Sequence, residues 1–207
     1  MGLSLLLVVH GRQGGVIPPV LQELAAELEQ RRRAPVRLQA LTGEAPPARE
    51  LRPAGGAGVW LVPLLLLPGS HVRVDVPAIA AHWRASGPVR RRPFLGAWPA
   101  WQQALAEELA GLGGEAEPLL LHHPLEGPLA ARYLQWLERL CSSRCVAAPY
   151  SATDPADPTL PALLVGSAVV LPLALAANRL CERLQLAPLL ERPRLRQVLL
   201  RELEQLP

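Results

Sequence analysis

The segment Val62-Pro-Leu-Leu-Leu-Leu-Pro-Gly69-Ser-His71 is an apolar run that ends in a Pro-Gly turn and then a histidine. A second apolar run, Leu5-Leu-Leu-Val-Val-His10-Gly11, stands near the start of the chain and also ends in a histidine. Short apolar runs bounded by glycine or proline are typical of buried strands in a parallel sheet. Parallel strands end at the same edge of their sheet, so the two runs predict that His10 and His71 share a crevice there.

The first half of the chain alternates apolar runs with segments of helical spacing. Such a βαβαβαβα alternation indicates the α/β class, with a parallel sheet that helices cover on both faces. In the common strand order 2-1-3-4, the ligand crevice lies between the ends of strands one and three. We expect strands at residues 3–9, 36–41, 59–67 and 93–98, and helices near residues 20–28, 46–51, 76–84 and 100–112.

The second half repeats this alternation in a weaker form. Its segment Leu163–Val169 aligns with Leu66–Val72, which places Ala168 where the first half has its second histidine. By the same alignment, the pair His122-His123 corresponds to His10. The repeat therefore predicts a metal site that is complete only in the first half.

The sequence thus predicts two doubly wound parallel-sheet lobes, of which the second is degenerate. The predicted lobes are residues 1–113 and 114–207, with a boundary at the glycine-rich segment 111–114. The elements expected in the second lobe are strands at residues 118–121, 145–148 and 162–165, a helix at residues 129–140, and two final helices.

Composition narrows the function classes. The chain of 207 residues is 50% hydrophobic and 19% charged, as expected of a folded protein. Its basic residues are all arginines, and the formal net charge of +3 is too small to predict nucleic-acid binding. No basic leader is evident, and the run Val59–Leu67 is shorter than the roughly 20 residues of a membrane span. Three cysteines form no disulfide framework, so we expect a cytoplasmic protein that does not enter a membrane.

The histidines determine the candidate chemistry. Neutral imidazole binds cobalt, nickel, iron and zinc, and it also accepts protons near neutral pH. His10 and His71 therefore form a candidate metal site, although a strand-end histidine also occurs as a packing or capping residue. His82, on a predicted helix, is expected to be an ordinary surface or packing residue. His122 and His123 either line a ligand site or pack.

The segments Leu7-Val-Val-His10-Gly11, Val62–Pro77 and Pro93-Phe-Leu-Gly96-Ala resemble the class II tetrapyrrole chelatases. This is the sirohydrochlorin cobaltochelatase and ferrochelatase family called CbiX or SirB. The most specific part of the resemblance is Gly69-Ser-His71-Val-Arg-Val-Asp75-Val-Pro77, because Gly-x-His-x-x-x-Asp-[Ile/Val]-Pro after an apolar strand is close to a characteristic stretch of that family. The resemblance extends over about the first 110 residues and is faint beyond them.

The resemblance implies a ferrochelatase-like fold of two lobes facing a cleft, and an enzyme that inserts Co²⁺ or Fe²⁺ into sirohydrochlorin. The metal would be a substrate, Ni²⁺ would suit the same ligands, and no organic cofactor is expected. On the matching positions, His10 and His71 would bind the metal and accept pyrrole protons. Glu44 is the nearest match to an acidic residue that the family often has after strand two. A monomer or a homodimer would be sufficient.

Two arginines are candidate contacts for the carboxylates of such a substrate. Arg12 and Arg73 each stand two residues after a candidate metal ligand, and a guanidinium pairs well with a carboxylate. The other interpretation is that both are solvent-exposed loop residues. The segment Arg12-Gln13-Gly14-Gly15 departs from the family, which usually has serine and a basic residue after the first His-Gly.

Two alternatives to the chelatase stay open. The first is a carrier of metal or tetrapyrrole that has the same fold and no turnover. The second is a flavodoxin-like domain whose loop Gly11–Gly15 binds phosphate. That loop lacks the Gly-x-Gly-x-x-Gly and Walker spacings, so the sequence favours it least.

Overall fold

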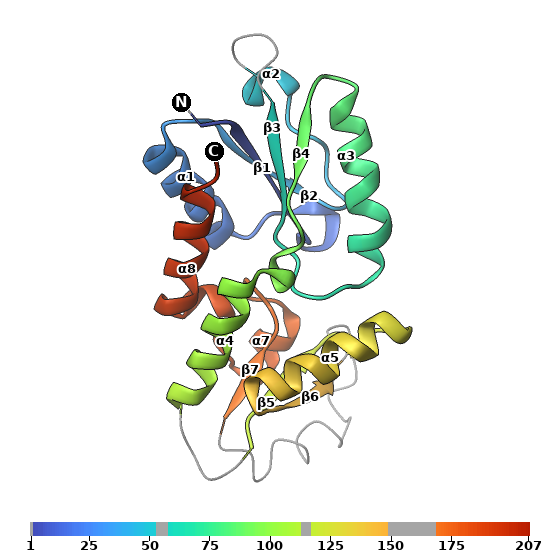
Figure 1. Cartoon of the computed structure of the whole chain (residues 1–207), viewed down its shortest axis with the longest axis vertical. Helices are drawn as coiled ribbons and strands as arrows, with labels where there is room; N and C mark the ends of the chain where they lie inside the picture. The colour runs from blue at the N-terminus through green and yellow to red at the C-terminus, as the bar shows by residue number, and fades with distance from the viewer. Residues whose placement is uncertain (1, 53–57, 113–116, 149–168) are drawn as a thin grey trace. The chain divides into compact units, whose positions relative to one another are not determined.

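The computed structural model describes residues 2–52, 58–112, 117–148 and 169–207. Two compact units make up the chain (Figure 1). The first is Met1–Trp98 together with Val198–Pro207, and the second is Pro99–Gln197. The boundary predicted at residues 113 and 114 lies outside the described residues. Helix α4 (Pro99–Leu112), which the predicted division gave to the first lobe, belongs to the second unit, where it packs against α5 (Pro128–Cys141).

The first unit is built on a parallel sheet of four strands in the order β2-β1-β3-β4. The central strand is β1 (Ser4–Val9), and all six of its residues are buried. It lies between β2 (Val36–Ala40) and β3 (Val59–Pro63), as the strand order 2-1-3-4 predicts. A strand buried on both faces requires a continuous apolar run, which explains why this segment shows no alternation.

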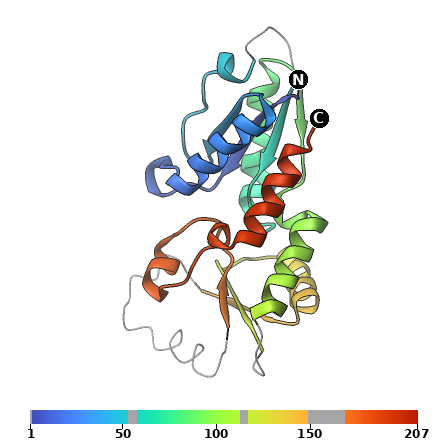
Figure 2. The same cartoon turned by 90° about the vertical axis from the view of Figure 1, so that its left-hand side faces the viewer.

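Helices α1 and α8 lie side by side on one face of this sheet (Figures 1 and 2). Helix α1 (Pro19–Arg32) begins at a proline and buries an apolar stripe that includes Leu24 and Leu28. At its end, the Arg32 guanidinium donates to the backbone carbonyls of Leu203 and Leu206, at 2.8 and 2.7 Å. This contact satisfies carbonyl groups at the end of α8 (Pro193–Glu204), where helical partners are missing. The same burial lowers the pKa of Arg32.

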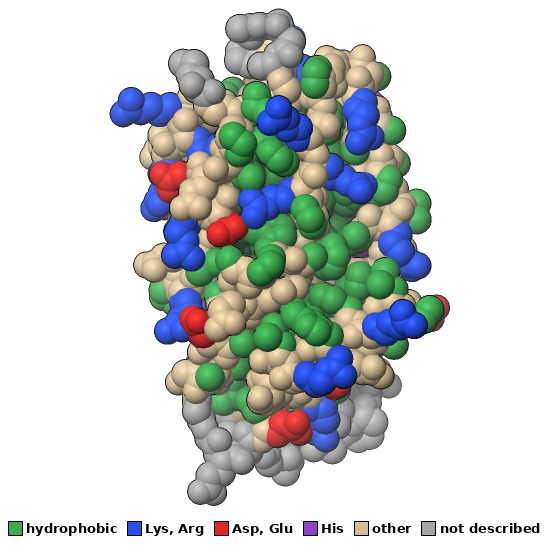
Figure 3. Space-filling view, viewed as in Figure 1, with side chains coloured by type: hydrophobic (Ala, Val, Ile, Leu, Met, Phe, Trp, Pro, Cys, Tyr) green, Lys and Arg blue, Asp and Glu red, His purple; other side chains and the backbone are tan. Residues whose placement is uncertain are grey.

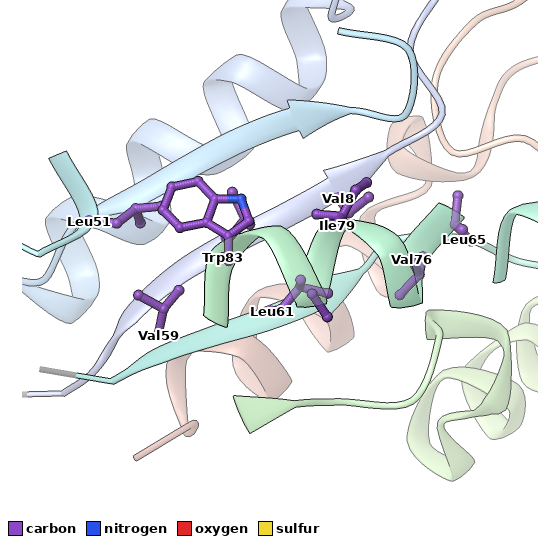
Figure 4. Packing of buried hydrophobic residues seen from close by; sticks show 10 residues of the cluster. Val8, Leu51, Val59, Leu61, Leu65, Val76, Ile79 and Trp83 are labelled. Carbon is purple, nitrogen blue, oxygen red and sulfur yellow. The ribbon is translucent and has the colours of Figure 1, made fainter. Parts of the chain in front are cut away.

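The opposite face of the sheet is covered by α3 (Val76–Arg84) and the short helix α2 (Ala48–Leu51). Figure 4 shows Val76, Ile79 and Trp83 of α3 against side chains of the strands. Leu61, at the centre of this cluster, is fully buried. This core holds α3 on the sheet and thereby fixes the segment that leads into it.

A buried hydrogen bond crosses this core. The indole Nε1 of Trp83 donates to the Oε1 of Gln39 on β2, at 2.9 Å. Both side chains are buried, with exposed fractions of 2% and 6%. A buried donor without a partner costs more than the bond itself contributes, so this pair specifies how α3 packs on β2.

We predict that Gln39→Leu lowers the free energy of unfolding by about 1–3 kcal/mol, because it leaves the Trp83 donor unsatisfied. Urea unfolding of Gln39→Leu, Trp83→Phe and the double variant measures the coupling between the two residues. The double variant should lose less than the sum of the single losses. Strictly additive losses would show that the hydrogen bond has no coupling energy.

The strand predicted at residues 93–98 is wrong. The fourth strand, β4, is Val89–Arg91, and residues 95–97 form a 3₁₀ turn. The parallel ladder ends where the Arg92 N–H donates to the Leu61 carbonyl at 3.0 Å, because Pro93 has no N–H with which to continue it. Edge strands often carry charged residues. The arginines of β4 therefore did not resemble the apolar runs from which the other strands were predicted.

In the described part of the second unit, three strands form a parallel sheet in the order β6-β5-β7. Its central strand is β5 (Leu119–His122), between β6 (Arg144–Ala147) and β7 (Val170–Pro172). In addition to α4 and α5, α7 (Arg179–Leu184) and the first residues of α8 belong to this unit. The prediction of a degenerate second α/β lobe agrees with this smaller sheet.

The predicted repeat rests on segment 163–169, of which residues 163–168 lie outside the described residues. Pro172 of β7 pairs with Leu121 of β5, just as Pro63 of β3 pairs with Val8 of β1. Strand β7 therefore has the same place beside β5 that β3 has beside β1. Ala168 lies outside the described residues, so its alignment with His71 stays a prediction. The strand predicted at residues 162–165 lies outside the described residues.

Two further observations concern the distribution of charge on the surface and the length of the helices. Arginine side chains are scattered over the face seen in Figure 3 and do not gather in one block. Within the described ranges, no helix is long and apolar enough to cross a membrane.

Candidate functional site

His10 is the first residue after β1. Pairing of β1 with β3 continues up to this point, because the Leu64 N–H donates to the Val8 carbonyl at 2.8 Å. The imidazole is exposed, and its Nδ1 lies 3.1 Å from the carbonyl oxygen of Gly11. A carbonyl only accepts, so in the neutral ring this contact places the proton on Nδ1. The lone pair is then on Nε2, the nitrogen free to bind a ligand.

His71 opens a single π-helical turn, η2 (His71–Asp75), which runs directly into α3. The strand predicted to reach residue 67 ends at Pro63, and the intervening residues lead to this turn. The Nδ1 of His71 lies 2.6 Å from the Oδ2 of Asp75. A carboxylate accepts, so this contact also places the proton on Nδ1 and leaves Nε2 with its lone pair. Single π-turns within helices are frequent at functional sites.

The structure brings the two imidazoles together. Their ring centres are 5.0 Å apart, and their planes meet edge to face at 84°. A metal bound at about 2.1 Å lies about 3.2 Å from the ring centre, so two imidazoles on one ion, 90–110° apart, have centres separated by about 4.5–5.2 Å. The observed separation of 5.0 Å falls within that range. Two rings at this spacing can share one metal ion.

The other candidate residues lie apart from this pair or around it. Glu44 is exposed in the loop after β2. Within the described ranges, no three His, Cys, Asp or Glu residues are grouped so that they could hold a metal ion, so the structure does not bring Glu44 to the two histidines. Arg12 and Arg73 are both exposed, the first beside the His10 loop and the second inside η2.

Glycines allow the loop after β1 to pack against the loop after β2. Gly15 has a φ of +76°, and a Cβ built on it would lie 2.8 Å from the Gly43 Cα. Gly14 has nearly the same φ, +77°, but nothing lies within 4 Å of its Cβ position. The close approach at Gly15 therefore sets the distance between the His10 loop and the loop that carries Glu44.

The two glycines form a matched pair for substitution. Gly14→Ala should cost only the strain of a left-handed residue, roughly 1–2 kcal/mol. Gly15→Ala should cost a further 1–3 kcal/mol or so, because Gly43 must move to make room. Thermal or urea unfolding of both variants measures the difference. Equal losses would mean that the two loops do not constrain each other.

The second unit has a histidine in the position of His10. His122 ends the central strand β5, and its Nδ1 lies 2.8 Å from the carbonyl of His123, which repeats the contact between His10 and Gly11. His122 differs in being 4% exposed. Burial lowers its pKa, and the neighbouring His123 lowers it further. The hydrogen bond to the His123 carbonyl and the charge of Glu138 oppose this shift without reversing it. His122 therefore stays neutral where an exposed histidine would be protonated.

This shift predicts a pH-dependent stability. Below a pH of about 6.5 the unfolded chain binds a proton at His122 that the folded protein resists, so the free energy of unfolding falls as the pH decreases. Above that pH, His122 is neutral in both the folded and the unfolded chain, so it no longer lowers the free energy of unfolding. His122→Asn keeps a donor for the His123 carbonyl and cannot titrate, so its unfolding free energy should fall less between pH 7 and 5. Urea unfolding across this range is the measurement, and an unchanged slope would contradict the assignment.

Asp75 was not among the site residues predicted from the sequence. The signal was present in its spacing, since residues four apart on a helix lie on the same face. The carboxylate is about as accessible as the imidazole it contacts, with side-chain exposures of 42% and 43%. Asp75 is therefore part of the site.

Three comparisons relate the chain to known proteins. Residues 4–112 match the model of the CbiX family. SirB from Bacillus subtilis with Fe³⁺ superimposes with a TM-score of 0.67 at 17% identity, over 99% of this chain and 96% of that one. The sirohydrochlorin chelatase SirB from Bacillus subtilis subspecies spizizenii, in complex with cobalt, gives a TM-score of 0.64 at 18% identity, over 100% and 97%. No curated protein sequence matches significantly. The structural likeness establishes a SirB-like α/β fold with two parallel sheets.

Proposed function

The chain belongs to the CbiX family, and we propose that it is a chelatase that inserts Co²⁺ or Fe²⁺ into sirohydrochlorin or a related tetrapyrrole. The observation that carries this proposal is the separation of 5.0 Å between the rings of His10 and His71, each with its Nδ1 engaged by an oxygen. The structures of similar fold, one with Fe³⁺ and one with cobalt, support a metal of this kind.

A chelatase must bind its metal and then release it. Insertion removes water from the cation and two protons from pyrrole nitrogens, so the site must supply replaceable ligands and a base. A closed cage of four protein ligands is typical of structural metal sites, whereas open coordination positions admit water and substrate. Two imidazoles on an exposed edge leave such positions for the nitrogens of the macrocycle.

The two histidines also match the proton balance of the reaction. One divalent cation enters the macrocycle and two protons leave it. Once the metal has passed into the macrocycle, the Nε2 lone pairs of His10 and His71 no longer bind it. Each imidazole can then accept one of the two protons. Glu44 would add a third, oxygen ligand if the loop after β2 closes toward the pair. Arg12 and Arg73, both exposed, would hold carboxylates at the rim of the macrocycle.

A carrier that binds metal or tetrapyrrole without turnover is the second candidate. The observation in its favour is that, among the described residues, the structure brings no third His, Cys, Asp or Glu ligand to the pair. Imidazole ligands accept cobalt, nickel and iron alike, so the ligand set does not choose among these metals.

We predict that the wild-type protein accelerates anaerobic insertion of Co²⁺ or Fe²⁺ into sirohydrochlorin, followed by the change in absorbance of the macrocycle. His10→Ala and His71→Ala should each reduce the rate at least 100-fold, because one imidazole alone holds the metal more weakly and cannot take both protons. His82→Ala, at an exposed position on α3, is the matched control and should keep the wild-type rate.

The carrier gives a different result in the same assay. Metal or tetrapyrrole would bind, and the insertion rate would stay at the spontaneous value with every variant. Turnover that survives both histidine substitutions would contradict the assigned site.

A further inference from the structure

We propose that Asp75 is a positioning residue that fixes the tautomer and the orientation of His71, so that Nε2 presents its lone pair to the incoming metal ion. The proposal rests on the chelatase function and extends it, since it gives the two histidines different properties. Its basis is the contact of 2.6 Å between Asp75 Oδ2 and His71 Nδ1.

The contact at His71 is of a stronger kind than the one at His10. A carboxylate that accepts an N–H makes a charge-assisted bond, which is shorter and stronger than a bond between neutral groups. His10 has only a neutral carbonyl as its partner, at 3.1 Å. A histidine that binds metal usually donates its other ring N–H to such an oxygen, which orients the ring and raises its basicity as a ligand. By this criterion, His71 is the better-oriented ligand of the two.

The π-helical turn is what presents this pair. The Val76 N–H donates to the His71 carbonyl, which closes a turn five residues long. Val76 is buried and Val72 packs against the same core, so the apolar residues anchor the turn on the sheet. His71 and Asp75 stay on its accessible side, with side-chain exposures of 43% and 42%. The turn therefore holds the carboxylate rigidly beside the ring.

The two histidines consequently differ in what holds them. His71 is attached to an anchored turn and is oriented by a negative charge. His10 follows the strand end, and its partner is the backbone of the next residue, Gly11, which has a φ of +72°. We assign His71 as the ligand that orients the metal. His10 can then turn more freely to release the metal and take a proton from the macrocycle.

Asp75→Asn is the informative variant. An asparagine side chain is nearly isosteric, but its NH₂ group can donate to Nδ1, which allows the proton to move to Nε2 and blocks the lone pair. Long-range ¹H–¹⁵N correlation spectra of the metal-free protein report the tautomer of His71. We expect the Nδ1–H form in the wild type and a substantial Nε2–H population in Asp75→Asn. A wild-type tautomer in the variant would overturn the proposal.

Metal affinity gives a second readout that does not depend on turnover. Titration with Co²⁺ alone should show a Kd that is 10–100-fold weaker for Asp75→Asn, the usual cost of removing such a partner. In a His71→Ala background the same substitution should have no further effect, whereas a merely structural role would persist. Glu23→Gln, which removes an exposed carboxylate on α1, is the charge control and should bind as the wild type does.

The outcomes separate the two proposals. If the wild type binds Co²⁺ without inserting it, the chelatase function fails, while the tautomer and the affinity still decide the role of Asp75. An unchanged Kd in Asp75→Asn would refute that role even if insertion is fast. If the wild type does not bind Co²⁺ at all, both proposals are overturned.

Discussion

The site depends on the parallel, in-register pairing of β1 with β3. Val8 pairs with Pro63, and the Leu64 N–H extends the ladder to the end of β1. Because the strands run in the same direction, the residue after β1 and the turn after β3 emerge at one edge of the sheet. A shift of register by one residue would turn each side chain of a strand to the opposite face of the sheet, so the packing of the apolar core also determines where the two histidines stand.

The sequence was sufficient to predict the central strands of the first unit and the histidine pair at their ends. Continuous apolar runs identified the central strands, and a histidine at the end of each run indicated the pair, because both signals lie within a few residues. The strand at Val89–Arg91 could not be found in this way. Its two arginines are exposed, and Arg90 lies over the ring of Trp60 at 5.9 Å, a contact that only the folded neighbours reveal. The Gly-Ser motif of the predicted repeat lies outside the described residues, so that alignment stays a prediction.

The candidate ligands show the same division between local and tertiary information. The contact between His71 and Asp75 follows from a spacing of four residues and was readable in principle. The position of Glu44 depends on how the loop after β2 packs on the glycines after β1, which no local pattern encodes. An open pair of imidazoles, one oriented by a carboxylate and one by a backbone carbonyl, is the arrangement on which the proposed chelatase depends, because it would bind a cation and still release it.

The most direct test of the central claim is X-ray absorption at the cobalt edge of the Co²⁺-loaded protein, in the wild type and in His71→Ala. Two imidazole groups on one ion produce a multiple-scattering pattern that differs from that of water and carboxylate. We expect two imidazoles on the cobalt of the wild type and at most one in the variant. A spectrum with only oxygen ligands, or one that His71→Ala leaves unchanged, would contradict it.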